Sequence, residues 1–269
     1  MADFPAVALE ITDERVAAAA GRLHDGGWAF SARQLYYAVC ADAEVPRVRV
    51  ASGEIGLGLV LVLVGVIIGQ RIVLFVVGGI GLLLVGLGAV THIAERRPEP
   101  LTRVLAISFA EFTQGFLGQG RTYDGMVDIH APAASEEATL IVCDRDDTAA
   151  VLAANRERIG EVAICTASGR PDNLRGRRVV CVHDCDPAGC GLVADLVDAG
   201  AEVVDAGINP REIAGRRVQL LEGAPARLPR DLTGRLEEPE IDWLRSGRRL
   251  EIATEPPEAL VTRVRGALG

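Results

Sequence analysis

From residue 138 to residue 208 the chain alternates short apolar segments with segments of helical pattern. The apolar segments are ATLIVCDRDD, EVAICTASGRPD, RRVVCVHDCDP and AEVVDAGI, and the helical ones are TAAVLAANRERIG and AGCGLVADLVDAG. Strands that are apolar along their whole length and are separated by helices are typical of a parallel sheet covered on both faces. The sequence therefore predicts an α/β fold built on a small parallel sheet with helices.

Acidic residues follow two of these predicted strands. Asp144 ends the first strand, and Asp184 and Asp186 end the third, just before Pro187 and a helix. Ligand sites of parallel sheets lie at the carboxyl ends of the strands. Carboxylates crowded there would repel one another without a cation, and Mg²⁺ accepts one or two carboxylates together with substrate phosphate. We expect Asp144, Asp184 and Asp186 to bind Mg²⁺; solvated acids that cap a helix are the alternative.

A long apolar block, residues 55–90, precedes this region and is interrupted only by Gln70 and Arg71. At about 1.5 Å per residue, its second half is long enough to span a hydrocarbon core of about 30 Å. Further arginines lie outside the two ends of the block, at Arg47, Arg49, Arg96 and Arg97. This bias predicts a transmembrane helical hairpin with the soluble parts in the cytoplasm. A hairpin buried in a soluble core is the alternative.

Charge and cysteine content restrict the possible partners. The net charge is −9, and all 28 basic residues are arginine. An acidic chain is a poor non-specific binder of nucleic acid, so any DNA contact needs a local arginine face. The six cysteines form no CxxC pair and fall in apolar runs, which favours buried, reduced thiols. A zinc site is a minor alternative, with Cys181, His183, Cys185 and Cys190 as its ligands.

The remaining segments are predicted to be mainly helical. ITDERVAAAAGRLHDG has Thr12 or Asp13 as its N-cap, WAFSARQLYYAVCADA is capped by Ser31, and PLTRVLAISFAEFTQGFLGQG forms a third helix. The end of the chain reads as a tail rich in Pro and Arg, with one helix at PEALVTRVRGAL. The expected division is residues 1–50 (helical), 51–95 (transmembrane hairpin), 96–135 (helical), 136–222 (parallel sheet with helices) and 223–269 (tail).

Three stretches resemble a known family. VVCVHDCDPAG looks like the DxDPxG strand of the Toprim domain, in the form found in the A subunit of topoisomerase VI and in Spo11 proteins. LIVCDRDD is similar to the first Toprim strand, with Asp144 and Arg145 in place of its Glu-Lys pair, and SGRPD is similar to the Gly-x-Pro-Asp loop. SARQLYYAV resembles the winged-helix motif, where Tyr37 falls at the position of the DNA-cleaving tyrosine and Arg33 at that of the motif's arginine. Gln34 departs from the acid of that motif.

The resemblance implies a winged-helix-like region in residues 1–50, continued in residues 96–135, and a Toprim-like domain in residues 136–222. It implies a membrane-anchored DNA-binding protein in which Tyr37, helped by Arg33, cleaves DNA by transesterification with Mg²⁺ held by the Toprim acids. DNA, a separate GHKL-type ATPase subunit and a second copy of the chain are the implied partners. Two alternatives remain: a catalytically degenerate Toprim module that binds nucleic acid or a partner, and a Toprim hydrolase that acts on phosphodiesters with metal but without a covalent tyrosine.

Overall fold

A parallel four-stranded sheet is the centre of the fold in the computed structural model, which describes residues 10–43, 102–103, 107–130, 139–213 and 218–269. Its strands are β2 (Thr139–Cys143), β3 (Ala163–Thr166), β4 (Arg178–Val182) and β5 (Glu202–Asp205). They pair in the order β3-β2-β4-β5, and every pair is parallel. The predicted small parallel sheet is therefore confirmed.

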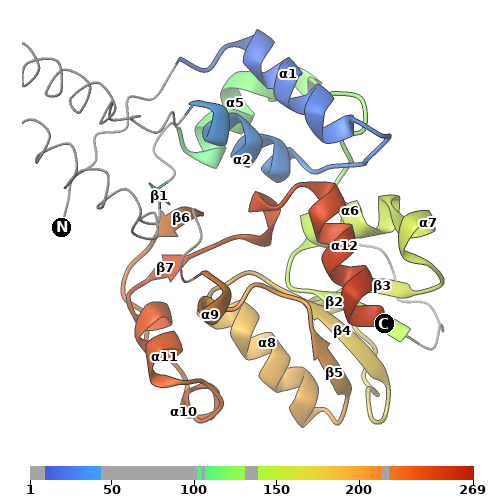
Figure 1. Cartoon of the computed structure of the whole chain (residues 1–269), viewed down its shortest axis with the longest axis vertical. Helices are drawn as coiled ribbons and strands as arrows, with labels where there is room; N and C mark the ends of the chain where they lie inside the picture. Colours follow the sequence, from blue (N-terminus) through green and yellow to red (C-terminus); the bar gives the residue numbers. More distant parts are fainter. Residues whose placement is uncertain (1–9, 44–101, 104–106, 131–138, 214–217) are drawn as a thin grey trace, which may run out of the picture. The chain divides into compact units, whose positions relative to one another are not determined.

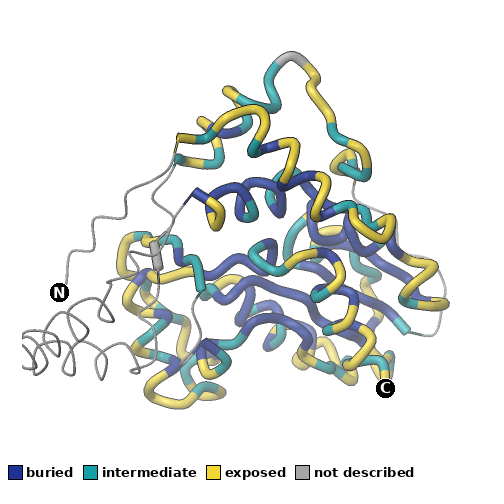
Figure 2. The backbone as a smooth tube through the Cα atoms, turned by 45° about the horizontal axis from the view of Figure 1, so that its top comes forward, coloured by how far each residue is buried: buried dark blue, intermediate teal, exposed yellow. Residues whose placement is uncertain are grey.

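Helices cover both faces of this sheet. Alternate residues of β2 and β4, such as Ile141 and Val180, pack with α6 (Asp146–Ala154) and α12 (Pro257–Leu268) in one apolar cluster. The residues between them pack with α8 (Pro187–Asp198) in another. Almost every residue of β2, β3 and β4 is buried, as the dark stretches of the tube in Figure 2 show, whereas the residues of the edge strand β5 are half-buried or exposed. Burial on both faces explains why the strands carry unbroken apolar runs instead of an alternating pattern.

The strand order creates a switch point between β2 and β4. The chain passes from β2 to β3 on one side, by way of α6 and the short helix α7 (Arg156–Ile159), and then crosses to β4 on the other side of β2. The following helix, α8, lies against the opposite face. In open parallel sheets, ligands bind outside the carboxyl ends of the strands where the order reverses in this way. Asp144 follows β2 and Asp184 follows β4 at this point.

Three helices from the first half of the described chain share a separate apolar cluster. They are α1 (Asp13–His24), capped by the Thr12 side chain, α2 (Ala32–Ala43) and α5 (Phe109–Phe116), capped by Ser108 (Figure 1). Ser31 caps α2 as predicted, because its hydroxyl accepts a hydrogen bond from the Gln34 amide while the Gln34 side chain accepts one from the Ser31 amide. All described residues belong to one compact unit.

The prediction for the segment that begins at residue 101 was partly wrong. Thr102–Arg103 form the short strand β1, and the predicted helix begins only at Phe109 and is followed by a 3₁₀ turn, Gly118–Gly120. β1 pairs in parallel with β6 (Gln219–Glu222), which in turn pairs with β7 (Arg248–Arg249) in antiparallel fashion. A strand of two residues leaves no periodicity in the sequence that could reveal it.

The last 50 residues contain more structure than the predicted tail. The short helix α9 (Pro210–Ile213) lies just before this part of the chain. Within it, α10 (Arg230–Thr233) and α11 (Glu238–Arg245) precede the 3₁₀ turn Ile252–Thr254, and the predicted final helix is present as α12. Leu250 exchanges two backbone hydrogen bonds with Cys185, at 2.8 and 3.2 Å. The segment around residue 250 therefore lies directly beside the turn that follows β4.

The predicted fold class needs a correction, which concerns the membrane. In the described ranges no helix is both long and apolar enough to cross a bilayer. The longest of them have 12 residues, or about 18 Å, against a hydrocarbon core of about 30 Å. The fold class that the described residues show is α/β with a small parallel sheet and helices. Residues 51–95, on which the hairpin and the membrane location were predicted, lie outside the described residues.

Candidate active site at the carboxyl edge of the sheet

Two of the three predicted metal ligands meet between β2 and β4. Asp144 follows β2 directly, and its Oδ2 accepts a hydrogen bond from the Asp184 amide at 2.7 Å. Asp184 lies two residues beyond β4, and its Oδ1 accepts from the Ile252 amide at 2.7 Å. The second oxygen of Asp144, Oδ1, is buried and has no hydrogen-bond partner in the part of the chain that the structure describes. Buried polar atoms are usually satisfied, so an orphan oxygen requires an explanation.

The two carboxyl groups resist ionisation. Burial, together with the negative charge of Asp186, raises the pKa of Asp144. Burial and the charge of Asp144 raise the pKa of Asp184. Backbone amides and Arg145 oppose these shifts only in part. A cation at this point would reverse both effects, since it would offset the lost solvation and the mutual repulsion of the two carboxylates.

The third predicted ligand, Asp186, has a local structural role. Its Oδ1 accepts from the Gly189 amide at 2.8 Å and caps α8, in which Pro187 takes the first position. A side chain at residue 189 would place its Cβ 2.3 Å from the Asp184 carbonyl oxygen, so only glycine fits. Among the described residues, no group of three or more His, Cys, Asp or Glu side chains is arranged to hold a metal ion. Asp186 therefore caps a helix, which was the alternative to metal binding, whereas Asp144 and Asp184 lie together as a pair.

A second polar pair lies on the neighbouring strands β4 and β5. The fully buried His183 ring contacts Asp205 Oδ1 through Nε2 at 3.0 Å and the Asp184 carbonyl through Nδ1 at 2.8 Å. A carbonyl can only accept, so Nδ1 carries a hydrogen. Burial lowers the pKa of His183, but the hydrogen bond and charge of Asp205 outweigh it, and the net shift is upward. Burial opposes ionisation of Asp205 as well, yet His183 brings its pKa down to about 2.

This pairing argues against the zinc alternative. Both nitrogens of His183 are already engaged with Asp205 and Asp184. All six cysteines are buried and none is in a disulfide within the described residues, as expected for reduced thiols. Burial raises the pKa of Cys190 to about 12 and that of Cys185 further, which disfavours the thiolate that zinc requires.

A network of charged side chains joins α2 to the edge of the sheet. Arg33 of α2 donates from Nε to Asp147 Oδ2 at 3.1 Å and from Nη1 to the two oxygens of Glu251 at 2.9 and 3.2 Å. Arg145 donates from Nε to Asp147 Oδ1 at 3.2 Å, and its Nη1 lies 3.6 Å from Asp184 Oδ2 and 3.9 Å from Glu251 Oε1. The two guanidinium groups therefore share the carboxylates of Asp147 and Glu251, and Arg145 also lies near Asp184.

Tyr37 lies on the same helix as Arg33, next to this network. Its side chain is 2 % exposed, and its hydroxyl has no hydrogen-bond partner within the described ranges. The hydroxyl approaches the Glu251 carboxylate without coming within hydrogen-bond distance. Burial, followed by the negative charge and the proximity of Glu251, raises the pKa of Tyr37 well above its usual value. The adjacent Tyr36 is satisfied, because its hydroxyl donates to the Ile107 carbonyl at 2.8 Å. In this arrangement the Tyr37 hydroxyl is neither ionised nor open to a large substrate.

Asp147 and Glu251 belong to the site but were not predicted from the sequence. Asp147 was visible as the second acid of the Asp146-Asp147 pair at the start of α6, where an acid is usual for helix reasons alone. Glu251 lies more than 60 residues beyond Asp184 in a segment predicted to be a tail, and no local pattern sets it apart. The pairing of Leu250 with Cys185 and the hydrogen bond from the Ile252 amide to Asp184 bring it to the site.

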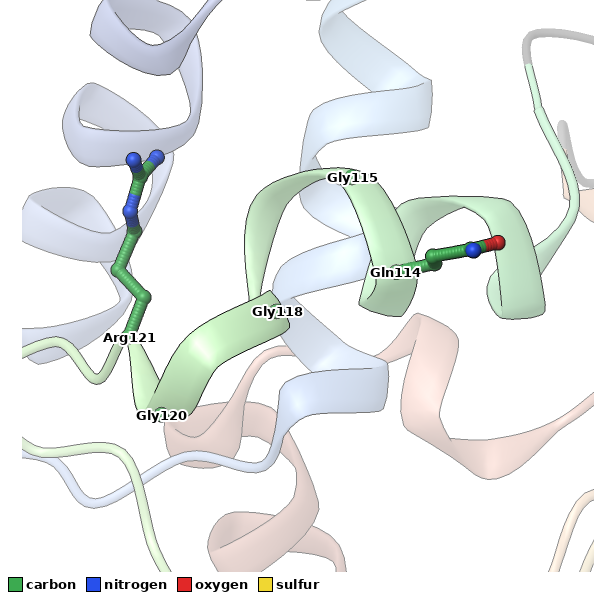
Figure 3. A pocket seen from close by; sticks show the side chains of 5 residues that line it. All are labelled: Gln114, Gly115, Gly118, Gly120 and Arg121. Atoms are coloured by element: carbon green, nitrogen blue, oxygen red, sulfur yellow. The ribbon is translucent and has the colours of Figure 1, made fainter.

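A surface hollow away from the sheet edge offers little chemistry. It has a volume of about 390 Å³ and lies at the end of α5 (Figure 3). Gln114, Gly115, Gly118, Gly120 and Arg121 line it. Three of these residues are glycines, and Arg121 is paired with Asp13 at 2.7 Å. None of the predicted site residues contributes to this hollow, so it does not compete with the carboxyl edge as a candidate site.

No protein-family model, curated protein or solved structure matches this chain. The resemblance to topoisomerase VI A subunits and Spo11 therefore depends on the short motifs alone. What the chain does has to be argued from its own residues.

Proposed function

We propose that this chain is a DNA-binding protein of the topoisomerase VI A and Spo11 kind, in which Asp144 and Asp184 bind Mg²⁺ against a DNA phosphate. The observation that carries the proposal is the carboxylate pair at the strand switch point, with Asp144 Oδ1 buried and without a partner among the described residues. Two carboxylates with one orphan oxygen suit Mg²⁺, which completes its shell with water and substrate oxygens. When bound, the ion would neutralise charge on the phosphate.

The chain's own residues divide the remaining work. Arg33 offers a guanidinium that matches phosphate oxygens. The Tyr37 oxygen would attack phosphorus and form the Tyr–phosphate bond, while the phenolic proton passes to water. The bond from phosphorus to the 3′ oxygen breaks, and that oxygen takes up a proton and leaves as a hydroxyl. This chemistry requires Tyr37 to become exposed, because its hydroxyl is now buried and its pKa is raised.

The burial of Tyr37 favours a second candidate, in which the same edge acts without a covalent tyrosine. In that case the aromatic ring is part of the core shared by α1, α2 and α5. The carboxylate pair then serves a metal-dependent phosphodiester hydrolase, or it only binds nucleic acid. A GHKL-type ATPase subunit and a second copy of the chain remain proposed partners in the first candidate.

A cleavage assay distinguishes the candidates. Purified full-length protein is incubated with supercoiled DNA and Mg²⁺, and covalent adducts are trapped with denaturant. Tyr37→Phe, Asp184→Asn and Asp186→Ala are compared with Tyr36→Phe, the matched control from the adjacent ring. Adducts lost in Tyr37→Phe but kept in Tyr36→Phe support the tyrosine reaction. Nicking that survives Tyr37→Phe but not Asp184→Asn supports the hydrolase, and the absence of DNA binding refutes the proposal.

A further inference from the structure

The Glu251 carboxylate lies between the guanidinium groups of Arg33 and Arg145. Its side chain is 11 % exposed, and its two oxygens are held by Nη1 of Arg33, with Nη1 of Arg145 at 3.9 Å from one of them. A carboxylate between two guanidinium groups has the charge, and nearly the geometry, of a phosphate between the same groups. Arginine is the residue best suited to such recognition, since its planar fork offers several donors.

Other groups hold the two arginines in place independently of Glu251. Asp147 accepts from both of them, one oxygen to each guanidinium, at 3.1 and 3.2 Å. The Arg33 guanidinium also lies over the Phe109 ring, 4.1 Å from its centre. If Glu251 left, Arg33 and Arg145 would keep their positions and their charge, and only the anion between them would be missing.

The backbone that carries Glu251 is also fixed independently. Leu250 pairs with Cys185, and the Ile252 amide donates to Asp184. Release of the Glu251 carboxylate therefore requires rotation of one side chain and leaves the segment in place. Arg145 is 31 % exposed, which gives an incoming anion a path to the site.

We infer that Arg33 and Arg145 form a binding site for a phosphodiester, which the chain fills with its own Glu251 carboxylate until a nucleic-acid phosphate replaces it. This inference rests on the proposed function for its substrate class, and it adds Arg145 and Glu251 to the site. Displacement also removes from the surroundings of Tyr37 the carboxylate that most disfavours a phenolate. Substrate entry and loosening of the tyrosine are in this way coupled through one side chain.

Inorganic pyrophosphate in metal-free buffer tests the anion site without depending on DNA activity. Glu251→Gln removes the competing charge and keeps the shape of the side chain. We expect it to lower the Kd for pyrophosphate roughly tenfold relative to the wild type. Glu258→Gln, an exposed change of the same kind on α12, should have no effect. Adding Arg145→Gln to Glu251→Gln should abolish the gain.

A second variant covers the case in which Glu251→Gln does not fold. Glu251→Asp keeps the charge but is one methylene shorter, and we expect a smaller gain in the same direction. Equal Kd values in the wild type and the folded Glu251 variants would overturn the inference, and so would a gain that survives Arg145→Gln.

A duplex DNA arm separates this inference from the proposed function. If Glu251→Gln gains pyrophosphate affinity but neither protein binds DNA, the anion site stands and the proposed function falls. If the wild type binds DNA with Mg²⁺ but Glu251→Gln gains nothing with either probe, the function stands and the anion site falls. Where both hold, the salt dependence of DNA binding should steepen by up to about one phosphate contact in Glu251→Gln.

Discussion

Two polar pairs lie side by side at the carboxyl edge of one sheet, and they differ in the signs of their charges and in how fully they are hydrogen-bonded. Between β4 and β5, His183 and Asp205 have opposite charges, and hydrogen bonds engage both ring nitrogens and both carboxylate oxygens. Between β2 and β4, Asp144 and Asp184 have the same charge, and one buried oxygen has no partner in the described chain. The first pair is complete as it stands, whereas the second would be completed by a cation.

This difference indicates a structural role for His183 and Asp205 and a binding role for Asp144 and Asp184. A satisfied buried ion pair holds two strand ends together without any ligand. Like charges kept in a buried position lower stability, and such sites persist where they serve binding or catalysis. The strand switch point lies at the second pair and not at the first, which agrees with this division.

The largest expected effect on stability comes from placing an additional carbon atom against His183, which forms the complete pair with Asp205. Gly207→Ala would place a Cβ 2.2 to 2.5 Å from three atoms of the His183 ring. Because that ring is fully buried and cannot move aside, we expect a loss of about 3 kcal/mol in the free energy of unfolding, measured with denaturant. Gly191→Ala is the control, since nothing lies within 4 Å of its Cβ and alanine favours a helix. Equal stability of the two variants would contradict the close packing described for His183.

The incomplete pair should respond to pH in a distinctive way. The pKa of Asp184 is raised in the folded protein, so the native state retains a proton that the unfolded chain loses, and stability falls as pH rises above the usual carboxyl range. Asp184→Asn removes this loss. We expect the variant to match the wild type near pH 5 and to exceed it by about 2 kcal/mol at pH 8 in metal-free buffer. A variant that is less stable than the wild type at pH 8 would refute the repulsion between the two carboxylates.

The complete pair should show the opposite sign. Asp205 has a lowered pKa, so its contribution is present above the usual carboxyl range and disappears as pH falls toward 2. The contribution of His183, whose pKa is raised, is present below its usual value and disappears as pH rises through the folded value. Asp205→Asn should therefore lower the free energy of unfolding by about 1.5 kcal/mol near pH 5–6, and by less on either side. A loss that is constant with pH would contradict the ion pair.

Two adjacent tyrosines also differ in whether the hydroxyl is hydrogen-bonded, and here the expected effect on stability is smallest. Tyr36→Phe removes the hydrogen bond to the Ile107 carbonyl and should cost about 1 kcal/mol. Tyr37→Phe removes a buried hydroxyl that has no partner among the described residues, and it should leave stability unchanged or slightly higher. Thermal unfolding of the two variants side by side tests this. A larger loss in Tyr37→Phe would show that its hydroxyl has a partner.

The sequence predicts the sheet well and the site only in part. The runs of β2, β3 and β4 are apolar on both faces, and the strand ends placed Asp144 and Asp184 at one edge, because parallel strands all end on the same side. The sequence could not separate the roles of Asp184 and Asp186, since both precede the same turn and only the hydrogen bond to Gly189 shows which one caps α8.

Long-range pairing explains the rest of what was missed. Glu251 reaches the site through the bridge between Leu250 and Cys185, which involves two residues and no periodic pattern. The second sheet, with β1, β6 and β7, consists of strands of two to four residues that leave no signal in the sequence. The motif positions of Arg33 and Tyr37 were visible, but their burial and partners follow from the packing of α2 against segments that are distant in the chain.

Calorimetric titration with MgCl₂ at pH 8 measures whether Asp144 and Asp184 bind a cation. We expect one Mg²⁺ site in the wild type, its loss in both Asp144→Asn and Asp184→Asn, and its retention in Asp205→Asn, which leaves these two carboxylates unchanged. If the wild type binds no Mg²⁺, the pair of Asp144 and Asp184 is not a cation site. The same conclusion follows if Asp144→Asn and Asp184→Asn both still bind the ion.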